Sequence, residues 1–133
     1  MSMKYEEKTG SVVVRVEPQY LDEQSYPDQN IYVWAYHVEI ENQGGEPIQL
    51  VNRFWKITDA MGRTQEVRGA GVVGEQPVIK PGSRYSYTSG TPLSTPSGIM
   101  LGSYEMSASP DKTFTVNIPA FSLDSPHESG KAN

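Results

Sequence analysis

Three glycines near the middle of the chain have the spacing of a nucleotide-binding loop. The segment VRGAGVVGEQP, residues 67–77, places Gly69, Gly71 and Gly74 in the pattern G-x-G-x-x-G. In dinucleotide-binding proteins this pattern joins a strand to a helix, and the first amides of that helix bind pyrophosphate. Here the chain continues as EQPVIKPGS, and its two prolines prevent a helix of useful length from beginning at Gly74.

The residues that follow the glycines also lack the chemistry of a nucleotide site. A dinucleotide site has a ribose-binding acid about 20 residues further on, but no Asp or Glu lies between Glu75 and Glu105. A P-loop ends in Lys followed by Ser or Thr, where this chain has Glu75 and Gln76. The pattern therefore favours glycines at positive-φ or bulged positions between strands. The alternative is a nest of backbone amides for a small anion, assisted by Arg53 or Arg68.

The sequence offers few residues that could form a catalytic or metal site. His37 and His127 are the only imidazoles, and we interpret His37 as an ordinary residue of a sheet. There is no G-x-S-x-G elbow, no cysteine, no H-E-x-x-H motif and no EF-hand loop. The acidic cluster of Asp22, Glu23 and Asp28 reads as a solvated loop. We predict a chain without enzymatic activity, cofactor or resident metal.

Composition restricts the classes of partner. The 133 residues are 36% hydrophobic and 20% charged, which is typical of one soluble globular domain. A net charge of −5 gives no general attraction to nucleic acid or to anionic lipid. The sequence has no cysteine, no signal-peptide pattern at its start and no run of 18 apolar residues. We expect a cytoplasmic protein that binds neither nucleic acid nor membrane.

Apolar residues alternate with polar ones along most of the chain, as they do in β-strands with one buried face. Residues 32–42, YVWAYHVEIEN, place their aromatic and large aliphatic residues on one face, and Val12, Val14 and Val16 do the same in an earlier segment. In IQLVNRFWKIT the apolar parity changes midway, which predicts a bulge near Asn52 and Arg53.

The number of such segments defines the expected architecture. About seven to eight strands separated by turn signals, with no helical periodicity, predict an all-β protein, an immunoglobulin-like or fibronectin-III-like sandwich of antiparallel strands. We expect residues 1–123 to form this domain and the polar residues 124–133 to form a disordered tail. An open sandwich has sheet edges, so a homodimer through edge strands is a further possibility.

The central and C-terminal segments are similar to the ApaG family. The likeness extends from about Val12 to Leu123 and is most specific in RGAGVVGEQPVIKPG, which has the family pattern R-G-x-G-V-V-G-x-x-P followed by P-G. Gly69, Gly71, Gly74 and Pro77 match that pattern, and Arg53 and Trp55 match the R-x-W pair of the family.

The resemblance implies an immunoglobulin-like or fibronectin-III-like sandwich and no established reaction. Bacterial ApaG proteins are associated with cobalt tolerance and magnesium efflux, and their genes often neighbour that of a diadenosine-tetraphosphate hydrolase. Related domains in eukaryotic F-box and DNA-polymerase-interacting proteins look like protein-binding modules. We therefore expect a non-enzymatic binding or adaptor domain with a protein partner. The alternative is a binder of pyrophosphate or nucleotide phosphate that uses the loop from Gly69 to Gly74.

Overall fold

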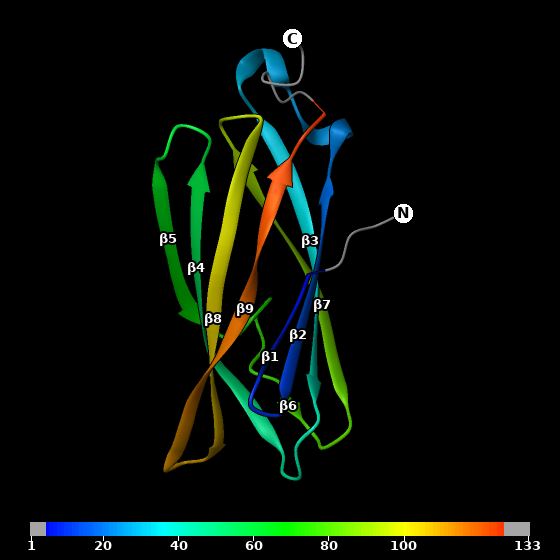
Figure 1. Ribbon diagram of the computed structural model, residues 1–133, viewed down its shortest axis with the longest axis vertical. Helices are drawn as coiled ribbons and strands as arrows, with labels where there is room; N and C mark the ends of the chain where they lie inside the picture. The colour runs from blue at the N-terminus through cyan, green and yellow to red at the C-terminus, as the bar shows by residue number, and fades with distance from the viewer. Residues whose placement is uncertain (1–4, 127–133) are drawn as a thin grey trace.

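Two antiparallel β-sheets pack face to face in the computed structural model, which describes residues 5–126 (Figure 1). The first sheet has the order β1-β2-β3-β7, with β1 (Tyr5–Thr9), β2 (Val12–Tyr20), β3 (Tyr32–Asn42) and β7 (Arg84–Leu93). The second has the order β5-β4-β8-β9, with β5 (Thr64–Ala70), β4 (Ile48–Asp59), β8 (Ser97–Ser109) and β9 (Lys112–Asp124); the short β6 (Val78–Ile79) also pairs with β4.

The predicted all-β sandwich of antiparallel strands is therefore confirmed, with more strands than the sequence suggested. One addition is β1, whose sequence YEEKT has Tyr5 as its only large apolar residue. The other is β6, which is only two residues long. Two short 3₁₀ helices, Asp22–Gln24 and Pro27–Gln29, lie between β2 and β3. Within the described residues, no helix is long and apolar enough to cross a membrane.

The inner faces of the two sheets form one hydrophobic core. On β2 and β3 the inward face is the one that the alternation predicted, because successive side chains of a strand point to opposite faces, but Val13 and Ala35 on the other face are buried as well. The core of the opposite sheet includes Trp55 and Phe121, whose rings meet edge to face with centroids 5.9 Å apart. Tyr36 of β3 contacts the Trp55 ring at 5.1 Å, so the aromatic side chains join the sheets.

A β-bulge in β4 determines which side chains of that strand face inward. The pairing with β8 shifts between Leu50 and Asn52, so the extra residue is Val51, next to the predicted position. Leu50 is buried before the bulge, and Trp55 is buried after it. The predicted change of face is confirmed. As a consequence Arg53 shares the inward face of β4 with Trp55.

The two long sides of the sandwich are closed differently. On one side β9 packs against β1 and β2, where the Tyr5 and Phe121 rings lie 6.0 Å apart and the Asn117 amide donates to Thr9 Oγ1 at 3.1 Å. On the other side the chain crosses from β5 to β7 through residues 71–83. This crossing contains the end of the glycine pattern, so the glycines lie where one sheet leads to the other.

The last strand extends into the region expected to be a tail. β9 includes Asp124, and Ser125 is buried, with its amide donating to the Pro96 carbonyl at 3.0 Å. The remainder of the predicted tail, residues 127–133, lies outside the described residues, and so does His127.

Candidate functional site

The last three residues of the glycine pattern form a tight turn. The Val72 amide donates to the Glu75 carbonyl at 2.8 Å, and the Glu75 amide donates back to Val72 at 2.9 Å. The two residues between them, Val73 and Gly74, have φ values of 43° and 82°. Positive φ at both central positions favours glycine. Gly74 thus has the structural role that the sequence predicted.

Gly71 is required by its backbone and its neighbours. Its φ is 61°, and a Cβ atom at this position would clash with the Glu75 carbonyl oxygen. Its amide donates to the Val51 carbonyl at 2.8 Å, next to the β4 bulge. The positive-φ interpretation is therefore confirmed for Gly71 as well.

Gly69 has a different reason to be glycine. It pairs in register with Arg53 inside the β4–β5 ladder, and its φ is not positive, so the prediction of a positive-φ or bulged position is wrong here. A Cβ atom on Gly69 would lie 2.8 Å from Cζ, Nη1 and Nη2 of Arg53. The bare backbone of Gly69 leaves room for the guanidinium group to lie across β5.

Arg53 is held by backbone oxygens. Its Nη1 donates to the Ala70 carbonyl at 3.2 Å and to the Gly71 carbonyl at 2.9 Å. Within the described residues no carboxylate lies within ion-pair distance of Arg53, whereas every other described arginine has one: Arg15, Arg63, Arg68 and Arg84. Arg53 is thus a half-buried cation without a counter-ion among residues 5–126.

A small pocket lies between the sheets beside this guanidinium group. Its volume is about 200 Å³, and its lining combines Arg53 and Trp55 of β4 with Tyr36 of β3, with Tyr87 and Ser89 of β7, and with the turn residues Val72, Val73 and Gly74. Arg53 of β4 pairs in register with Tyr104 of β8, which is fully buried. The Tyr104 hydroxyl hydrogen-bonds to the Tyr87 hydroxyl. Tyr36 and Tyr87 therefore line the pocket, and Tyr104 contacts it only through its bond to Tyr87.

These hydroxyls stay protonated at neutral pH. Burial raises the pKa of Tyr36, Tyr87 and Tyr104, because a phenolate is poorly solvated between the sheets. The nearby Arg53 charge acts in the opposite direction on the pKa of all three. Arg53 is therefore electrostatically close to each hydroxyl. The pocket offers one positive charge and neutral O–H groups.

Arg68, the second arginine of the sequence hypothesis, lies apart from this pocket. Its guanidinium group stacks over the Phe54 ring at 4.3 Å, and its Nη2 is 3.7 Å from Glu66. Arg68, Arg53 and Gly69 do border a common hollow of about 450 Å³, whose lining also includes Glu105. Gly71 and Gly74 are not part of that lining. The structure thus divides the predicted site residues between two hollows.

The amides of the loop are largely used within the protein. Those of Gly71, Val72 and Glu75 donate to backbone carbonyls. Val73 and Gly74, at the tip of the turn, have no such bond. The predicted nest for an anion is thus reduced to two amides.

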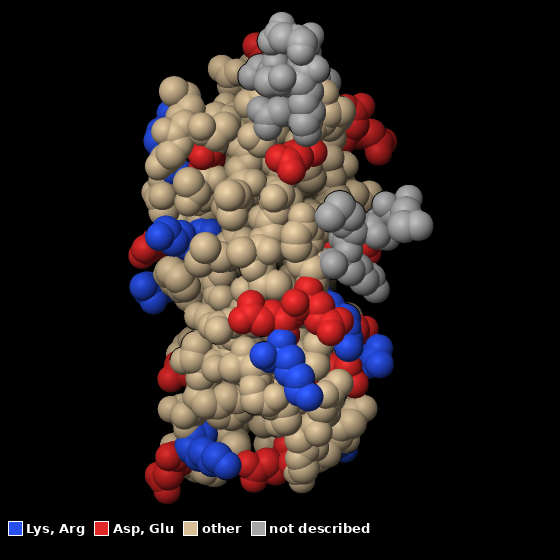
Figure 2. All heavy atoms as spheres, viewed as in Figure 1, with Lys and Arg blue, Asp and Glu red and all other residues tan. Residues whose placement is uncertain are grey.

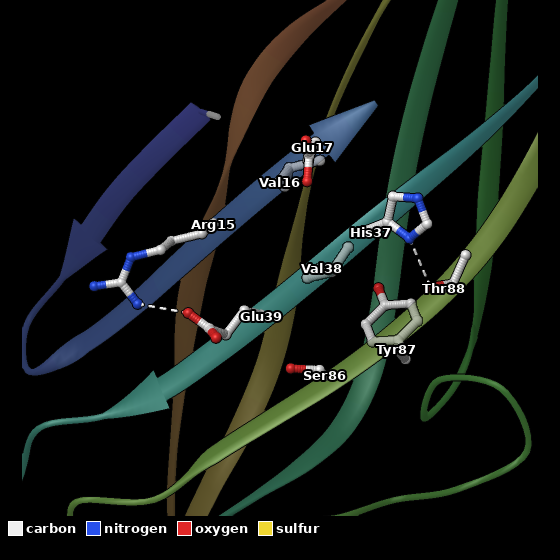
Figure 3. A pocket seen from close by; sticks show the side chains of 9 residues that line it. All are labelled: Arg15, Val16, Glu17, His37, Val38, Glu39, Ser86, Tyr87 and Thr88. Carbon is white, nitrogen blue, oxygen red and sulfur yellow. Dashed lines mark hydrogen bonds and ion pairs between the residues drawn. The ribbon is translucent and has the colours of Figure 1, made fainter. Parts of the chain in front are cut away.

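A third hollow, of about 330 Å³, lies on the outer face of the four-stranded sheet (Figure 3). Arg15 donates there to Glu6, Glu39 and Glu41, each at 2.9 Å. His37 hydrogen-bonds to Thr88 at 2.8 Å and to Gln19 at 2.9 Å, so both of its ring nitrogens are occupied. Within residues 5–126 no three His, Asp or Glu side chains gather closely enough to hold a metal ion.

Comparison with known sequences identifies the family of this chain. A model of the ApaG domain matches residues 22–108. The chain belongs to the ApaG family. The ApaG protein of Parvibaculum lavamentivorans is 61% identical over 123 residues, covering 92% of this chain and 95% of that protein. That of Rhodospirillum centenum is 59% identical over 129 residues, covering 97% and 99%.

Solved structures of other proteins have a similar fold. The crystal structure of the putative ApaA protein from Bordetella pertussis superposes with a TM-score of 0.83 at 49% identity, covering 86% of this chain and 94% of that one. The C-terminal domain of wzt has a TM-score of 0.53 at 13% identity, a likeness of fold alone. Of the residues on which the sequence resemblance rested, Arg53, Trp55 and Gly74 line the pocket.

Sequence reasoning missed the residues that face Arg53 from the other sheet, namely Tyr36, Tyr87 and Ser89. The alternation placed Tyr36 on the buried face of its strand, and Ser89 was given no role. One signal was available: after the bulge, Arg53 has the same parity as Trp55 and Ile57. An arginine on a buried parity needs polar partners, which indicates a polar site between the sheets.

Proposed function

We propose that this ApaG-family chain is a non-enzymatic binding module whose partner is another protein. The observation that carries the proposal is a pair of exposed aliphatic side chains, Ile99 and Leu101, on the outer face of β8. They are 50% and 40% exposed and lie two residues apart, so they point to the same side of the strand. Scattered exposed apolar residues are common, but neighbouring ones indicate a contact surface.

The surroundings of this pair suit a protein partner. In the pairing of β4 with β8, Leu101 lies opposite Lys56 and Ile99 opposite Thr58. Figure 2 shows few charged side chains on the surface over the upper part of β8 and β9. A surface with an apolar centre and charges at its margin is typical of protein interfaces.

The neighbouring strand β5 provides a second element for such a contact. It pairs only with β4 and has mostly exposed side chains, so one edge of its backbone is unpaired by any strand of the described residues. An extended segment of a partner, or of a second copy, can pair with such an edge. Charged Glu66 and Arg68 on β5 limit unspecific pairing.

The alternative, binding of pyrophosphate or nucleotide phosphate by the loop from Gly69 to Gly74, has less support. Three of the loop amides already donate to carbonyls, and Arg68 lies against Phe54 and Glu66. A polyanion would therefore meet one cation and two amides. Titration of isotope-labelled protein with pyrophosphate examines this alternative, since it predicts saturable shifts of the Val73 and Gly74 amides.

The protein-binding proposal is tested by comparative affinity capture from a lysate of the source organism. The baits are the wild-type chain, the double variant Ile99→Asp and Leu101→Asp, and the control Val78→Asp. Val78 is 60% exposed on β6, which pairs with the other end of β4. We expect specific proteins to be retained by the wild type and the control and lost by the double variant. Identical retention by all three folded baits, or turnover of a phosphorylated substrate, contradicts the proposal.

A further inference from the structure

The starting observation is the incomplete coordination of Arg53. A guanidinium group has five N–H donors in a planar fork. The two bonds to the Ala70 and Gly71 carbonyls both come from Nη1. Within residues 5–126, Nε and Nη2 donate no hydrogen bond, although the group is half-buried. The anchoring bonds fix the orientation of the fork and leave donors for a ligand.

The opposite wall of the pocket supplies further donors. Tyr36 and Ser89 both line it, and the Ser89 side chain acts to lower the pKa of Tyr36, so the two hydroxyl groups lie near each other. Each hydroxyl can accept one hydrogen bond and donate another. The Val73 and Gly74 amides lie at the turn that closes the same pocket. Donors from both sheets and from the connecting turn therefore surround one small volume.

The size and charge of the pocket select among anions. A volume of about 200 Å³ accepts a small group and excludes a nucleotide. Arg53 is the only cationic residue in the lining, and Glu75 follows the turn directly. One guanidinium group balances one negative charge, and its fork matches the two oxygens of a carboxylate. A phosphate dianion would leave an unbalanced charge in a partly buried site of an acidic protein.

We propose that the pocket between Arg53, Tyr36 and Ser89 binds a carboxylate group, carried either by a small organic acid or by the end of a peptide chain. Gly69 provides the space for the Arg53 fork, and the turn at Val73 and Gly74 closes the pocket. This site is separate from the outer surface at Ile99 and Leu101. If the pocket proves not to bind a carboxylate, the protein-binding proposal is unaffected.

The test is a titration of the isotope-labelled full-length protein with sodium acetate, followed by amide NMR and compared with sodium chloride at equal ionic strength. We expect saturable shifts of the Val73 and Gly74 amides with a dissociation constant of roughly millimolar order, as suits a ligand of four heavy atoms. Shifts that fail to saturate, or that chloride reproduces, would overturn the proposal.

Variants locate the site. Arg53→Lys keeps the charge but removes the fork and is expected to weaken acetate binding at least tenfold, and Ser89→Ala is expected to weaken it less. Arg68→Lys, the matched control, is expected to leave it unchanged. If Arg53→Lys fails to fold, Ser89→Ala carries the test. Loss of binding in Arg68→Lys, or unchanged binding in both pocket variants, contradicts the assignment.

Two further ligands define the chemistry. Inorganic phosphate that saturates the same amides at lower concentration than acetate would overturn the choice of carboxylate. Acetyl-diglycine with a free carboxyl end is compared with its amide. Tighter binding of the free acid than of acetate supports a peptide end as the ligand. Equal binding of the free acid and acetate supports a small organic acid. Binding of the amide as strongly as the acid contradicts the proposal.

Discussion

Two arginines border hollows of this sandwich, and their surroundings are opposite in kind. Arg15 lies on the outer face of β2, where it contacts the carboxylates of Glu6, Glu39 and Glu41 at 2.9 Å; Figure 3 shows the contact with Glu39. Arg53 lies on the inner face of β4, where two backbone carbonyls accept its hydrogen bonds and tyrosine hydroxyls line the space beside it. Both are partly exposed.

The difference separates a structural cation from a binding cation. The carboxylates around Arg15 raise its pKa further and accept hydrogen bonds from its Nε and Nη1, and the hydrogen bond from Arg15 lowers the pKa of Glu41. An external anion at Arg15 would have to displace these groups. Arg53 has no such competitor among the described residues. An open hollow next to an arginine therefore indicates a ligand only where the arginine lacks its own counter-ions.

The largest expected effect on stability is at Gly71, whose carbonyl accepts a hydrogen bond from Arg53. Gly71→Ala introduces a side chain at positive φ and against the Glu75 carbonyl, so we expect it to lower the free energy of unfolding by about 2–4 kcal/mol. Gly74→Ala, also at positive φ but with open space around its Cβ, is expected to cost about 1 kcal/mol. Urea unfolding measures both. Equal losses would contradict the close backbone contact at Gly71.

The tyrosine wall of the Arg53 pocket is the next target. Tyr87→Phe or Tyr104→Phe leaves one buried hydroxyl without its partner, and each is expected to cost about 1–2 kcal/mol. The double variant removes both hydroxyls, so its cost should be smaller than the sum of the single costs. A double-mutant cycle measured by urea unfolding yields the coupling. Strict additivity would mean that the two hydroxyls do not depend on each other.

A pH-dependent effect distinguishes the two arginines. Arg15→Met is expected to lower Tm by about 2–5 °C at pH 7. The pKa of Glu41 lies below its ordinary value of 4.5 in the folded protein, so its stabilising contribution is present above that value and is lost as the pH falls through the folded pKa. The Tm difference between wild type and Arg15→Met should therefore shrink in acid.

The matched variant Arg53→Met has no carboxylate partner to release. Its Tm difference from wild type should stay constant between pH 7 and pH 4 in thermal unfolding monitored by circular dichroism. An acid-sensitive difference for Arg53→Met would reveal a carboxylate partner and would remove the distinction between the two arginines.

The smallest effect is expected at the proposed protein-binding surface. Ile99→Ser should change the free energy of unfolding by less than about 0.5 kcal/mol, because half of the side chain is already exposed. Val78→Ser is the matched control, with 60% exposure. Chemical denaturation measures both. A loss at Ile99 several times that at Val78 would show that Ile99 serves the fold rather than a partner.

Local pattern was sufficient to predict much of the fold. The inward faces of β2 and β3 follow from strict alternation, and the bulge in β4 follows from a change of apolar parity within one strand. The strand β1 was missed because Tyr5 is its only large apolar residue, and its place is determined by contact with Phe121 at the far end of the chain.

The site depended on relations that no local pattern contains. The role of Gly69 is defined by Arg53 on the neighbouring strand, whereas the sequence connected the two residues only as parts of one anion nest and not through the packing of the guanidinium group on Gly69. Tyr87 and Ser89 reach Arg53 only because the two sheets pack face to face. The sequence predicted glycines at positive φ in this loop, as found at Gly71 and Gly74, but no local pattern indicated that the turn at Val73 and Gly74 closes a pocket.

The most direct test of the account follows both arginines in one experiment. The Nε–H side-chain resonances of Arg53 and Arg15 are recorded in the same ¹⁵N-labelled sample during an acetate titration at constant ionic strength. We predict a saturable shift for Arg53 and no saturable shift for Arg15. An unchanged Arg53 resonance in the folded protein, or equal shifts of both resonances, would contradict the claim that Arg53 is the cation left open for a ligand.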